Sequence, residues 1–174
     1  FGPERNCTRR ELMIFLWRLA GKPDAAGSMA FSDMASYTPG SDTYKAVLWG
    51  IENGITKGFS DGTFRPEITV NRKDCMIMLY RAAGKPYVNI PDYTGIDPED
   101  IFGDKIELPY QDVESLGYPH ESDTYTSIFW AWQNEITKGY EDGTFRPFDG
   151  CQRAQVVTFL YRVHKIPDLN IEGK

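Results

Sequence analysis

The sequence predicts an all-α fold assembled from helix–loop–helix repeats, on three observations. Residues 53–66, NGITKGFSDGTFRP, recur almost unchanged at 134–147 as NEITKGYEDGTFRP. A short segment typical of a helix N-terminus occurs three times, and apolar residues at helical spacing follow each copy. Because one unit of this size cannot bury its own apolar face, we expect the units to pack on one another around a pseudo-threefold axis.

The three helix-start segments share one pattern. A helix N-cap position is followed by an arginine, and the third helical position, N3, carries a side chain that reaches back to the N-cap. We call these segments capping boxes and their arginines the box arginines. The boxes are Cys7-Thr8-Arg9-Arg10-Glu11, Val70-Asn71-Arg72-Lys73-Asp74 and Cys151-Gln152-Arg153-Ala154-Gln155. We expect the third box to be the weakest, because Gln is a poor N-cap.

The elements follow in order from these signals. Residues 1–23 are the second half of a first repeat, with one helix that ends at Gly21-Lys22-Pro23. Its apolar face consists of Leu12, Phe15, Leu16 and Leu19. The sequence lacks the opening helix and loop of this repeat, and either upstream residues or another chain would supply them. We also expect the other two repeats or a second chain to cover the apolar face.

The second and third repeats are nearly complete. The second covers residues 31–86, with an opening helix that begins at Ser41-Asp42 and a second helix after its capping box. The third covers residues 110–167, in which Ser122-Asp123 repeats the opening signal. Residues 87–109 form an acidic, proline-containing connecting segment, and residues 168–174 a tail that we expect to fray. The acidic segment lacks the ligand spacing of an EF-hand, so we expect no calcium site there.

Composition excludes several classes of function. The chain has 174 residues and a net charge of −6, which makes it a poor general binder of nucleic acid or anionic membrane. No apolar run approaches the roughly 20 residues of a membrane-spanning helix, so we expect no membrane insertion. Nothing in the sequence indicates a metal site or a cofactor. The cysteines, Cys7, Cys75 and Cys151, are odd in number, and we expect no disulfide because a threefold arrangement separates Cys7 from Cys151 unless both lie at the axis.

The repeated motifs resemble the S-layer homology family over nearly the whole chain outside 87–109. The pattern begins with Phe31-Ser32-Asp33 and Tyr110-Gln111-Asp112. It continues with the loops Gly54-Ile55-Thr56-Lys57-Gly58 and Glu135-Ile136-Thr137-Lys138-Gly139, an Asp-Gly turn and a capping box. The sequence departs from the family at Asp42 and Asp123, where an aromatic residue is usual.

The resemblance implies a secreted module without catalytic residues that attaches proteins to the bacterial cell wall, in or beneath an S-layer. The expected partner is an anionic, often pyruvylated, secondary cell-wall polysaccharide, bound in grooves between repeats. The alternative partner is another cell-surface protein, which would make the chain an assembly module. An enzyme acting on glycans is a third hypothesis. The repeats argue against it, because active sites rarely come as equivalent copies.

The resemblance places Arg9, Arg72 and Arg153 and the loop residues Lys57, Lys138, Gly58 and Gly139 in these grooves. Asp33, Asp112 and Gln155 are the other candidate ligand-binding residues. An arginine in the first turn of a helix is unfavourable beside the helix dipole, unless it helps the free N–H groups to hold an anion. Its planar fork suits a carboxylate. The structural alternative is that each box arginine pairs with a carboxylate such as that of Asp33 or Asp112 and holds the repeats together.

Two further sets of residues recur. Trp49 and Trp130 are equivalent, and either pack in the core or stack on a sugar ring; the core is the more frequent role of an aromatic residue at helical spacing. Arg18, Arg81 and Arg162 each follow a box arginine by nine residues. We expect these to be solvated or paired with carboxylates.

Overall fold

The computed structural model describes residues 2–92, 107–167, 169 and 171. These residues form helices and loops without a β-strand, which confirms the all-α prediction. The elements are α1 (Arg9–Leu19), a short 3-10 helix η1 (Ser32–Met34), α2 (Asp42–Glu52), α3 (Arg72–Ala82), α4 (Gln111–Glu114), α5 (Asp123–Gln133) and α6 (Arg153–His164). Residues 93–106 of the acidic connecting segment lie outside the described part of the chain.

The capping boxes start their helices as the sequence predicts. The Thr8 side chain accepts a hydrogen bond from the backbone N–H of Glu11, and Glu11 Oε2 accepts one from Thr8 N at 3.0 Å. At α3 one of these two bonds is present, because the Asn71 side chain accepts the Asp74 N–H at 2.8 Å. In the third box Gln155 Oε1 accepts the Gln152 backbone N–H at 3.0 Å, so even this weaker box retains one of the two reciprocal bonds.

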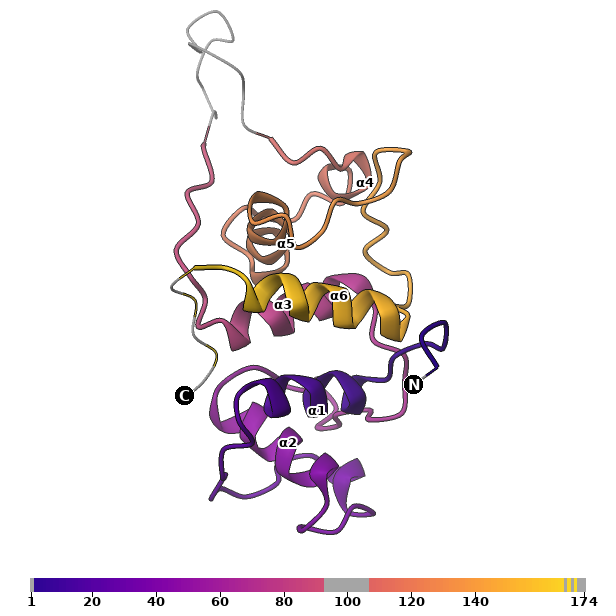
Figure 1. Ribbon diagram of the computed structural model, residues 1–174, viewed down its shortest axis with the longest axis vertical. Helices are drawn as coiled ribbons and strands as arrows, with labels where there is room; N and C mark the ends of the chain where they lie inside the picture. Colours follow the sequence, from indigo (N-terminus) through magenta and orange to yellow (C-terminus); the bar gives the residue numbers. More distant parts are fainter. Residues whose placement is uncertain (1, 93–106, 168, 170, 172–174) are drawn as a thin grey trace, which may run out of the picture.

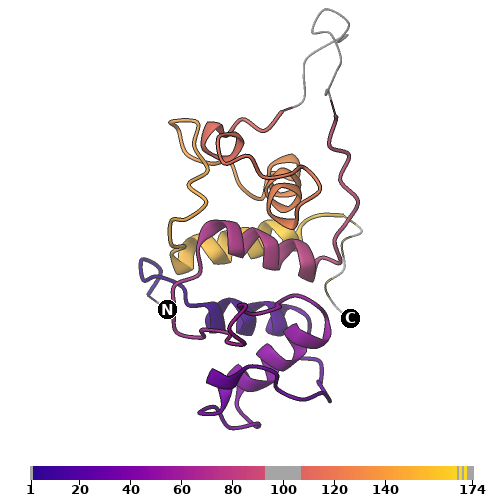
Figure 2. The same ribbon diagram turned by 180° about the vertical axis from the view of Figure 1, so that it is seen from behind.

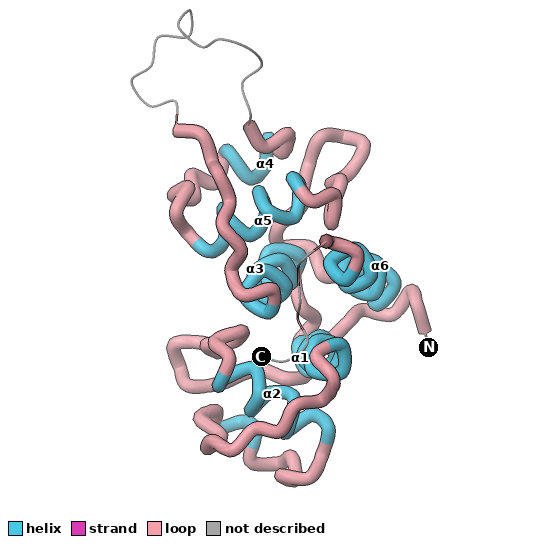
Figure 3. The backbone as a smooth tube through the Cα atoms, turned by 60° about the vertical axis from the view of Figure 1, so that its left-hand side comes forward, coloured by secondary structure: helices cyan, strands magenta, loops and turns pink. Residues whose placement is uncertain are grey.

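A ring of backbone hydrogen bonds joins the three boxes and confirms the pseudo-threefold arrangement. Cys7 N donates to Cys151 O at 2.8 Å, Cys151 N donates to Val70 O at 2.9 Å, and Val70 N donates to Cys7 O at 2.9 Å. These three residues occupy the same position of their boxes, so the bonds close a cycle around the axis. Figure 3 shows the helices that follow, α1, α3 and α6, at the corners of a triangle.

The cysteines lie in this ring and the helix beside it. Cys7, Cys75 and Cys151 are buried and free, which agrees with the expectation of no disulfide. The backbone bond between Cys7 and Cys151 shows that these two residues do lie at the axis, which is the exception that the sequence argument allowed.

The main helix–helix contacts run across the boundaries of the repeats. Helix α1 of the first repeat packs against α2 of the second, and α3 of the second packs against α5 of the third (Figure 1). Leu12 and Leu16 of α1 are fully buried, so the second repeat covers the face that the first repeat alone would expose. Each such side chain contributes roughly 1.5–3 kcal/mol by leaving water.

Helix α6 lacks an equivalent partner among the described residues. Figure 2 shows it in yellow beside α3, with which it makes its main contact with another helix. Tyr161 of α6 is 62% exposed, whereas Trp17 and Tyr80, at the same position of α1 and α3, are 4% and 6% exposed. Val157 is 40% exposed, although its equivalent Met76 is buried. In the described part of the chain, the helix with a partly uncovered apolar face is therefore α6 rather than α1.

The described part of the C-terminal tail is less frayed than expected. Ile171 is buried against the core at 5% exposure, and Leu169 packs beside it. Burial of these two apolar side chains removes hydrocarbon surface from water, and this holds them against the core.

Candidate functional site

Two grooves lie at equivalent positions between repeats in the described part of the chain. Each is lined by a box arginine of one repeat, by the tight loop of the next repeat, and by the helix that follows that loop. We name them after their arginines. The Arg9 groove measures about 450 Å³ and runs between the loop at 56–59 and helix α3. The Arg72 groove measures about 230 Å³ and runs between the loop at 137–140 and helix α6.

Arg9 of the first repeat is held by residues of the second repeat. Its side chain is nearly buried, and the residue is 3% exposed. Its Nε donates to Phe64 O at 2.9 Å and its Nη1 donates to Asp74 Oδ2 at 3.1 Å. The guanidinium also lies over the rings of Phe59 and Phe64, 4.7 and 5.0 Å from their centroids. Arg9 is therefore a clamp between the first and second repeats.

Arg72 occupies the equivalent position with a different set of partners. It is also 3% exposed, and its Nε donates to Phe145 O at 2.7 Å. Its Nη2 donates to Thr137 Oγ1 at 3.3 Å, and its guanidinium lies 4.9 Å from the centroid of the Tyr140 ring. Both of these hydrogen-bond acceptors are neutral. Among the described residues, no carboxylate forms an ion pair with Arg72.

Arg153 pairs with a carboxylate, as Arg9 does. Its Nη1 donates to Glu11 Oε1 at 2.6 Å, and the two side chains are only 13% and 10% exposed. Arg5 reaches the same Glu11 oxygen from the solvent side, also at 2.6 Å. The two copies of the loop line the Arg9 and Arg72 grooves, and neither lies in a groove with Arg153 among the described residues.

The box arginines thus follow one rule with one exception. Arg9 and Arg153 each reach the side chain at position N3 of the next box around the axis. Arg9 pairs with Asp74 there and Arg153 pairs with Glu11, whereas the N3 residue next to Arg72 is the neutral Gln155. The alternative that a box arginine pairs with a carboxylate therefore holds for Arg9 and Arg153 but not for Arg72, and the partners of those two differ from the expected ones. They are N3 carboxylates, and not Asp33 or Asp112.

The loop residues lie where the motifs predict. Lys57 and Lys138 are exposed and line the two grooves with Gly58 and Gly139. Gly139 has a φ of +68°, and a Cβ on it would lie 2.4 Å from Tyr110 Cε1. This glycine is required by the backbone conformation and by the ring packed against it, whether or not it contacts a ligand.

Comparison with known proteins gives the family. Residues 30–74 and 120–157 match the family model described as S-layer homology domain. These two regions belong to the S-layer homology family. The chain is 26% identical to "Cell surface glycoprotein 1" of Acetivibrio thermocellus over 98% of its length, and 28% identical to the "Cellulosome-anchoring protein" of the same organism over 93%. It spans 7% and 33% of the lengths of these two relatives.

The aspartates that open the S-layer homology repeats hold the loops. Asp112 Oδ1 accepts the Phe145 N–H at 2.8 Å and Oδ2 accepts the Arg146 N–H at 2.6 Å. Asp33 makes the same pair of bonds to Phe64 and Arg65 in the second repeat. Because both oxygens of each carboxylate accept backbone donors, these residues shape the loop. Their predicted contact with a ligand stays a prediction.

Trp49 and Trp130 are core residues of the opening helices. Each is 2% exposed, and Trp130 packs on Tyr80 of α3 with ring centroids 5.6 Å apart. Of the two roles that the sequence allows, the structure shows packing, because a sugar ring cannot stack on an indole that is covered by protein.

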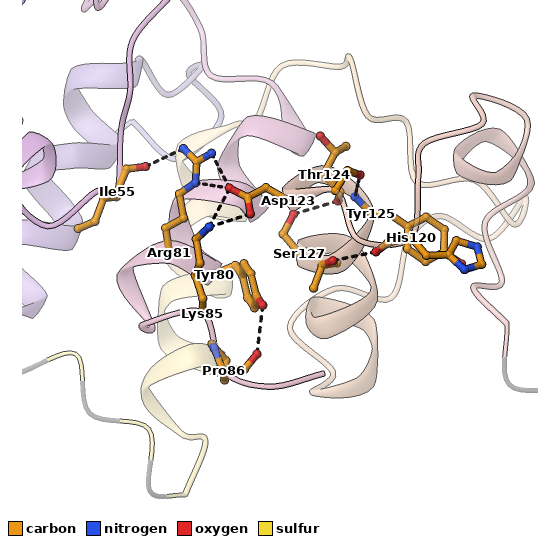
Figure 4. A network of polar contacts seen from close by, with 12 residues as sticks. Ile55, Tyr80, Arg81, Lys85, Pro86, His120, Asp123, Thr124, Tyr125 and Ser127 are labelled. Atoms are coloured by element: carbon orange, nitrogen blue, oxygen red, sulfur yellow. Dashed lines mark hydrogen bonds and ion pairs between the residues drawn. The ribbon is translucent and has the colours of Figure 1, made fainter. Parts of the chain in front are cut away.

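At the positions where the family usually has an aromatic residue, Asp42 and Asp123 form ion pairs instead. Arg81 Nη2 lies 2.6 Å from Asp123 Oδ2, and Lys85 Nζ lies 2.9 Å from Asp123 Oδ1 (Figure 4). Arg18 pairs with Asp42 at 2.7 Å in the second repeat. The carboxylate pairing expected for Arg18 and Arg81 is therefore present. Arg162, the third equivalent, donates to the backbone oxygen of Ile136 at 2.9 Å and lines the Arg72 groove.

Sequence reasoning missed several residues that line the grooves. The aromatic residue after each loop glycine, Phe59 or Tyr140, lies between two arginines; Arg65 and Arg146 each lie 4.0 Å from the centroid of these rings. Thr56 and Thr137 line the same walls. The signal was present, since each of these residues recurs at the same interval as the loop itself.

No cluster of histidine, cysteine and carboxylate side chains suited to a metal ion occurs among the described residues. None of the described helices is long and apolar enough to cross a membrane.

Proposed function

We infer that this chain attaches a larger protein to the bacterial cell surface by binding an anionic, pyruvylated secondary cell-wall polysaccharide in the grooves between its repeats. The observation that carries the inference is the concentration of cations in the grooves of an acidic chain. Arg72, Lys138 and Arg162 line one groove, in which no Asp or Glu side chain takes part. The chain as a whole carries a net charge of −6, which repels polyanions, so the attraction is local.

The relatives support the attachment part of this inference. One is named a cell surface glycoprotein and the other a cellulosome-anchoring protein, and both are much longer than this chain. A repeated module that is similar to part of these two longer proteins fits a role in attachment better than one in catalysis.

The test is a pull-down with purified cell-wall sacculi, before and after chemical removal of the non-peptidoglycan polysaccharide. We expect binding to the intact sacculi and its loss after removal. Equal binding before and after removal would rule out the polysaccharide as the ligand.

A matched pair of variants separates groove binding from general charge. Lys57→Gln with Lys138→Gln removes one exposed cation from each groove, and Lys22→Gln with Lys45→Gln removes the same charge elsewhere. We expect the first pair to weaken binding at least tenfold, which is about 1.4 kcal/mol, and the second to leave it unchanged. Because multiple grooves and a repeating polymer add avidity, binding is best measured with solubilised polysaccharide fragments.

The alternative is a module for assembly with another surface protein, and one observation favours it. Helix α6 exposes Val157 and Tyr161, which the other two repeats cover at equivalent positions. Retention of the chain by protein-bearing cell envelopes, but not by sacculi stripped of protein, would support assembly and contradict the polysaccharide.

A further inference from the structure

A hollow of about 840 Å³ lies outside both grooves, between the segment at 85–92 and the start of α5. We call it the Tyr87 hollow. Its volume is within the roughly 300–1,000 Å³ that is usual for sites of small ligands. None of its described lining residues lines the Arg9 groove or the Arg72 groove.

One wall of the hollow presents an aromatic ring to water. Tyr87 is 89% exposed, more than any other large apolar or aromatic side chain in the described part of the chain. The segment alternates, because Val88 and Ile90 pack against the core while Tyr87 and Asn89 are exposed. The backbone is therefore anchored on one side, and the ring and the amide are held out on the other.

The opposite wall is formed by the residues around the start of α5. The His120 ring stacks on the Tyr125 ring, with centroids 4.4 Å apart (Figure 4). Thr126 Oγ1 donates to His120 O at 2.9 Å. These contacts hold the wall in place before any ligand binds, which lowers the entropic cost of binding.

The other junction between repeats shows that the fold does not require these side chains. After the Gly-Lys-Pro stop, the first repeat has Asp24 where the second has Tyr87. Before the opening helix, the second repeat has Pro39 where the third has His120. Helix α2 nevertheless begins at Asp42 and packs on α1 as α5 packs on α3. The exposed tyrosine and the histidine are thus additions at one junction.

The charges of the hollow favour an uncharged ligand. Lys85 Nζ lies 2.9 Å from Asp123 Oδ1, so this ammonium already has a carboxylate. Asp92 and Glu121 place two more carboxylates in the walls. An anion gains little there. A sugar ring suits the hollow better, because its C–H faces pack on an aromatic ring and its hydroxyls both donate and accept hydrogen bonds.

The hollow and the Arg9 groove adjoin the same ion pairs. Arg81 lines the groove and Lys85 lines the hollow. Both side chains bind Asp123, at 2.6 and 2.9 Å, from successive turns at the end of α3 (Figure 4). A polymer that leaves the groove beside Arg81 therefore has only this cluster to cross before it reaches the hollow.

We propose that the Tyr87 hollow is a second glycan subsite, which takes an uncharged pyranose ring of the polymer that the grooves bind. The Tyr87 ring packs on one face of the sugar, and the polar side chains of both walls bind its hydroxyls. This proposal rests on the proposed function and adds a contact that the repeated motifs do not contain. Two linked contacts strengthen the binding of long fragments, because the second is made at a high effective concentration.

The experiment is a calorimetric titration with solubilised cell-wall polysaccharide, separated into single repeating units and longer fragments. We expect Tyr87→Ala to weaken binding of the longer fragments at least fivefold and to leave binding of the single units unchanged. Tyr87→Phe, which keeps the ring, should bind the longer fragments like the parent. Unchanged binding of the longer fragments by Tyr87→Ala would overturn the proposal.

Phe148→Ala is the matched control. Phe148 is 60% exposed and lines neither the hollow nor the two grooves. We expect this variant to bind every fragment like the parent, and an equal loss in Phe148→Ala and Tyr87→Ala would overturn the proposal. Because both side chains are exposed, both variants should keep the parent melting temperature.

A resonance measurement on the unmodified chain tests the uncharged ligand directly. Longer fragments are treated with mild acid, which removes pyruvate ketals, and are added to saturation. The ring resonances of Tyr87 are expected to shift with treated and untreated fragments alike. If the chain binds untreated fragments but these resonances do not shift, the subsite is wrong and the proposed function stands. If the chain binds neither sacculi nor fragments, the proposed function fails, and the subsite fails with it.

Discussion

Replacement of Glu11 by Gln would test the contribution of an N3 carboxylate to the fold. Glu11 is 8% exposed and serves two boxes at once, because it accepts the Thr8 N–H of its own box and pairs with Arg153 of the third. Glu11→Gln keeps the shape of the side chain and the bond to Thr8, as Gln155 does naturally at 3.0 Å. It removes the charge beside Arg153.

The magnitude follows from the burial of the pair. Removing one partner of a buried ion pair typically costs about 3–5 kcal/mol, because the other charge is left in a poor environment. The Glu11–Arg153 pair is not completely buried, at 10% and 13% exposure, so we expect about 2–4 kcal/mol. The bond to Arg5, whose side chain is 55% exposed, adds little. In a domain of this size the loss corresponds to a fall of roughly 5–15 °C in melting temperature.

The pH dependence gives a second, independent check. Burial alone would raise the pKa of Glu11, but the Thr8 N–H and the charges of Arg5 and Arg153 outweigh it and hold the pKa below its ordinary value. A carboxyl group with a lowered pKa stabilises the fold above its unfolded pKa of about 4.3, and this contribution is lost as the pH falls through the folded value. The free energies of unfolding of the parent and of Glu11→Gln, measured by circular dichroism, should therefore differ at pH 7 and become similar near pH 3. Equal stability at pH 7, or a difference that persists in acid, would refute the reasoning.

Three further predictions concern packing. Gly139→Ala is expected to lower the free energy of unfolding by about 2–5 kcal/mol, because φ is positive there and the new Cβ meets Tyr110. Gly143→Ala should lower it by only about 1–2 kcal/mol, because its Cβ meets no atom closer than 3.9 Å. Urea unfolding of the two variants measures the difference. Tyr80→Ser should destabilise by about 3 kcal/mol or more and Tyr161→Ser by less than about 0.5 kcal/mol, because the first side chain is buried and the second exposed. Iodoacetamide should label no cysteine of the native chain within minutes and all three after unfolding, since burial raises the pKa of the Cys7 thiol to about 12 and all three thiols are buried.

The helices and their order were predictable because the signals are local. An N-cap, an N3 acceptor and a Gly-Lys-Pro stop act within a few residues of chain, so Thr8 and Glu11 indicate the start of α1 without knowledge of the rest. The repetition of these signals extends the prediction from one helix to the arrangement of all three repeats. Equivalent boxes predict equivalent positions, and the ring of hydrogen bonds among Cys7, Val70 and Cys151 has the symmetry that they predict.

The partners of charged side chains were less predictable, because they depend on which repeat lies beside which. Asp33 and Arg9 are both prominent in the motif, yet Asp33 binds backbone N–H groups of its own repeat and Arg9 finds Asp74 across the boundary. The covered face of α1 and the exposed face of α6 have the same origin. Helix α1 packs on α2 and α3 packs on α5, each in the next repeat, whereas α6 has no comparable partner among the described residues. The sequence of any one unit does not indicate this.

These observations also explain how one arginine position can serve two purposes. At N1 of a helix a cation faces the positive end of the helix dipole, so the position is favourable only when an anion lies nearby. For Arg9 and Arg153 the anion is an N3 carboxylate, and the result is a clamp between repeats. For Arg72 the N3 residue is Gln155, and the same geometry leaves a buried positive charge at the wall of a groove. A single change of carboxylate to amide thus converts a structural contact into a candidate binding site without altering the backbone, because Gln155 still accepts the N–H that its box requires.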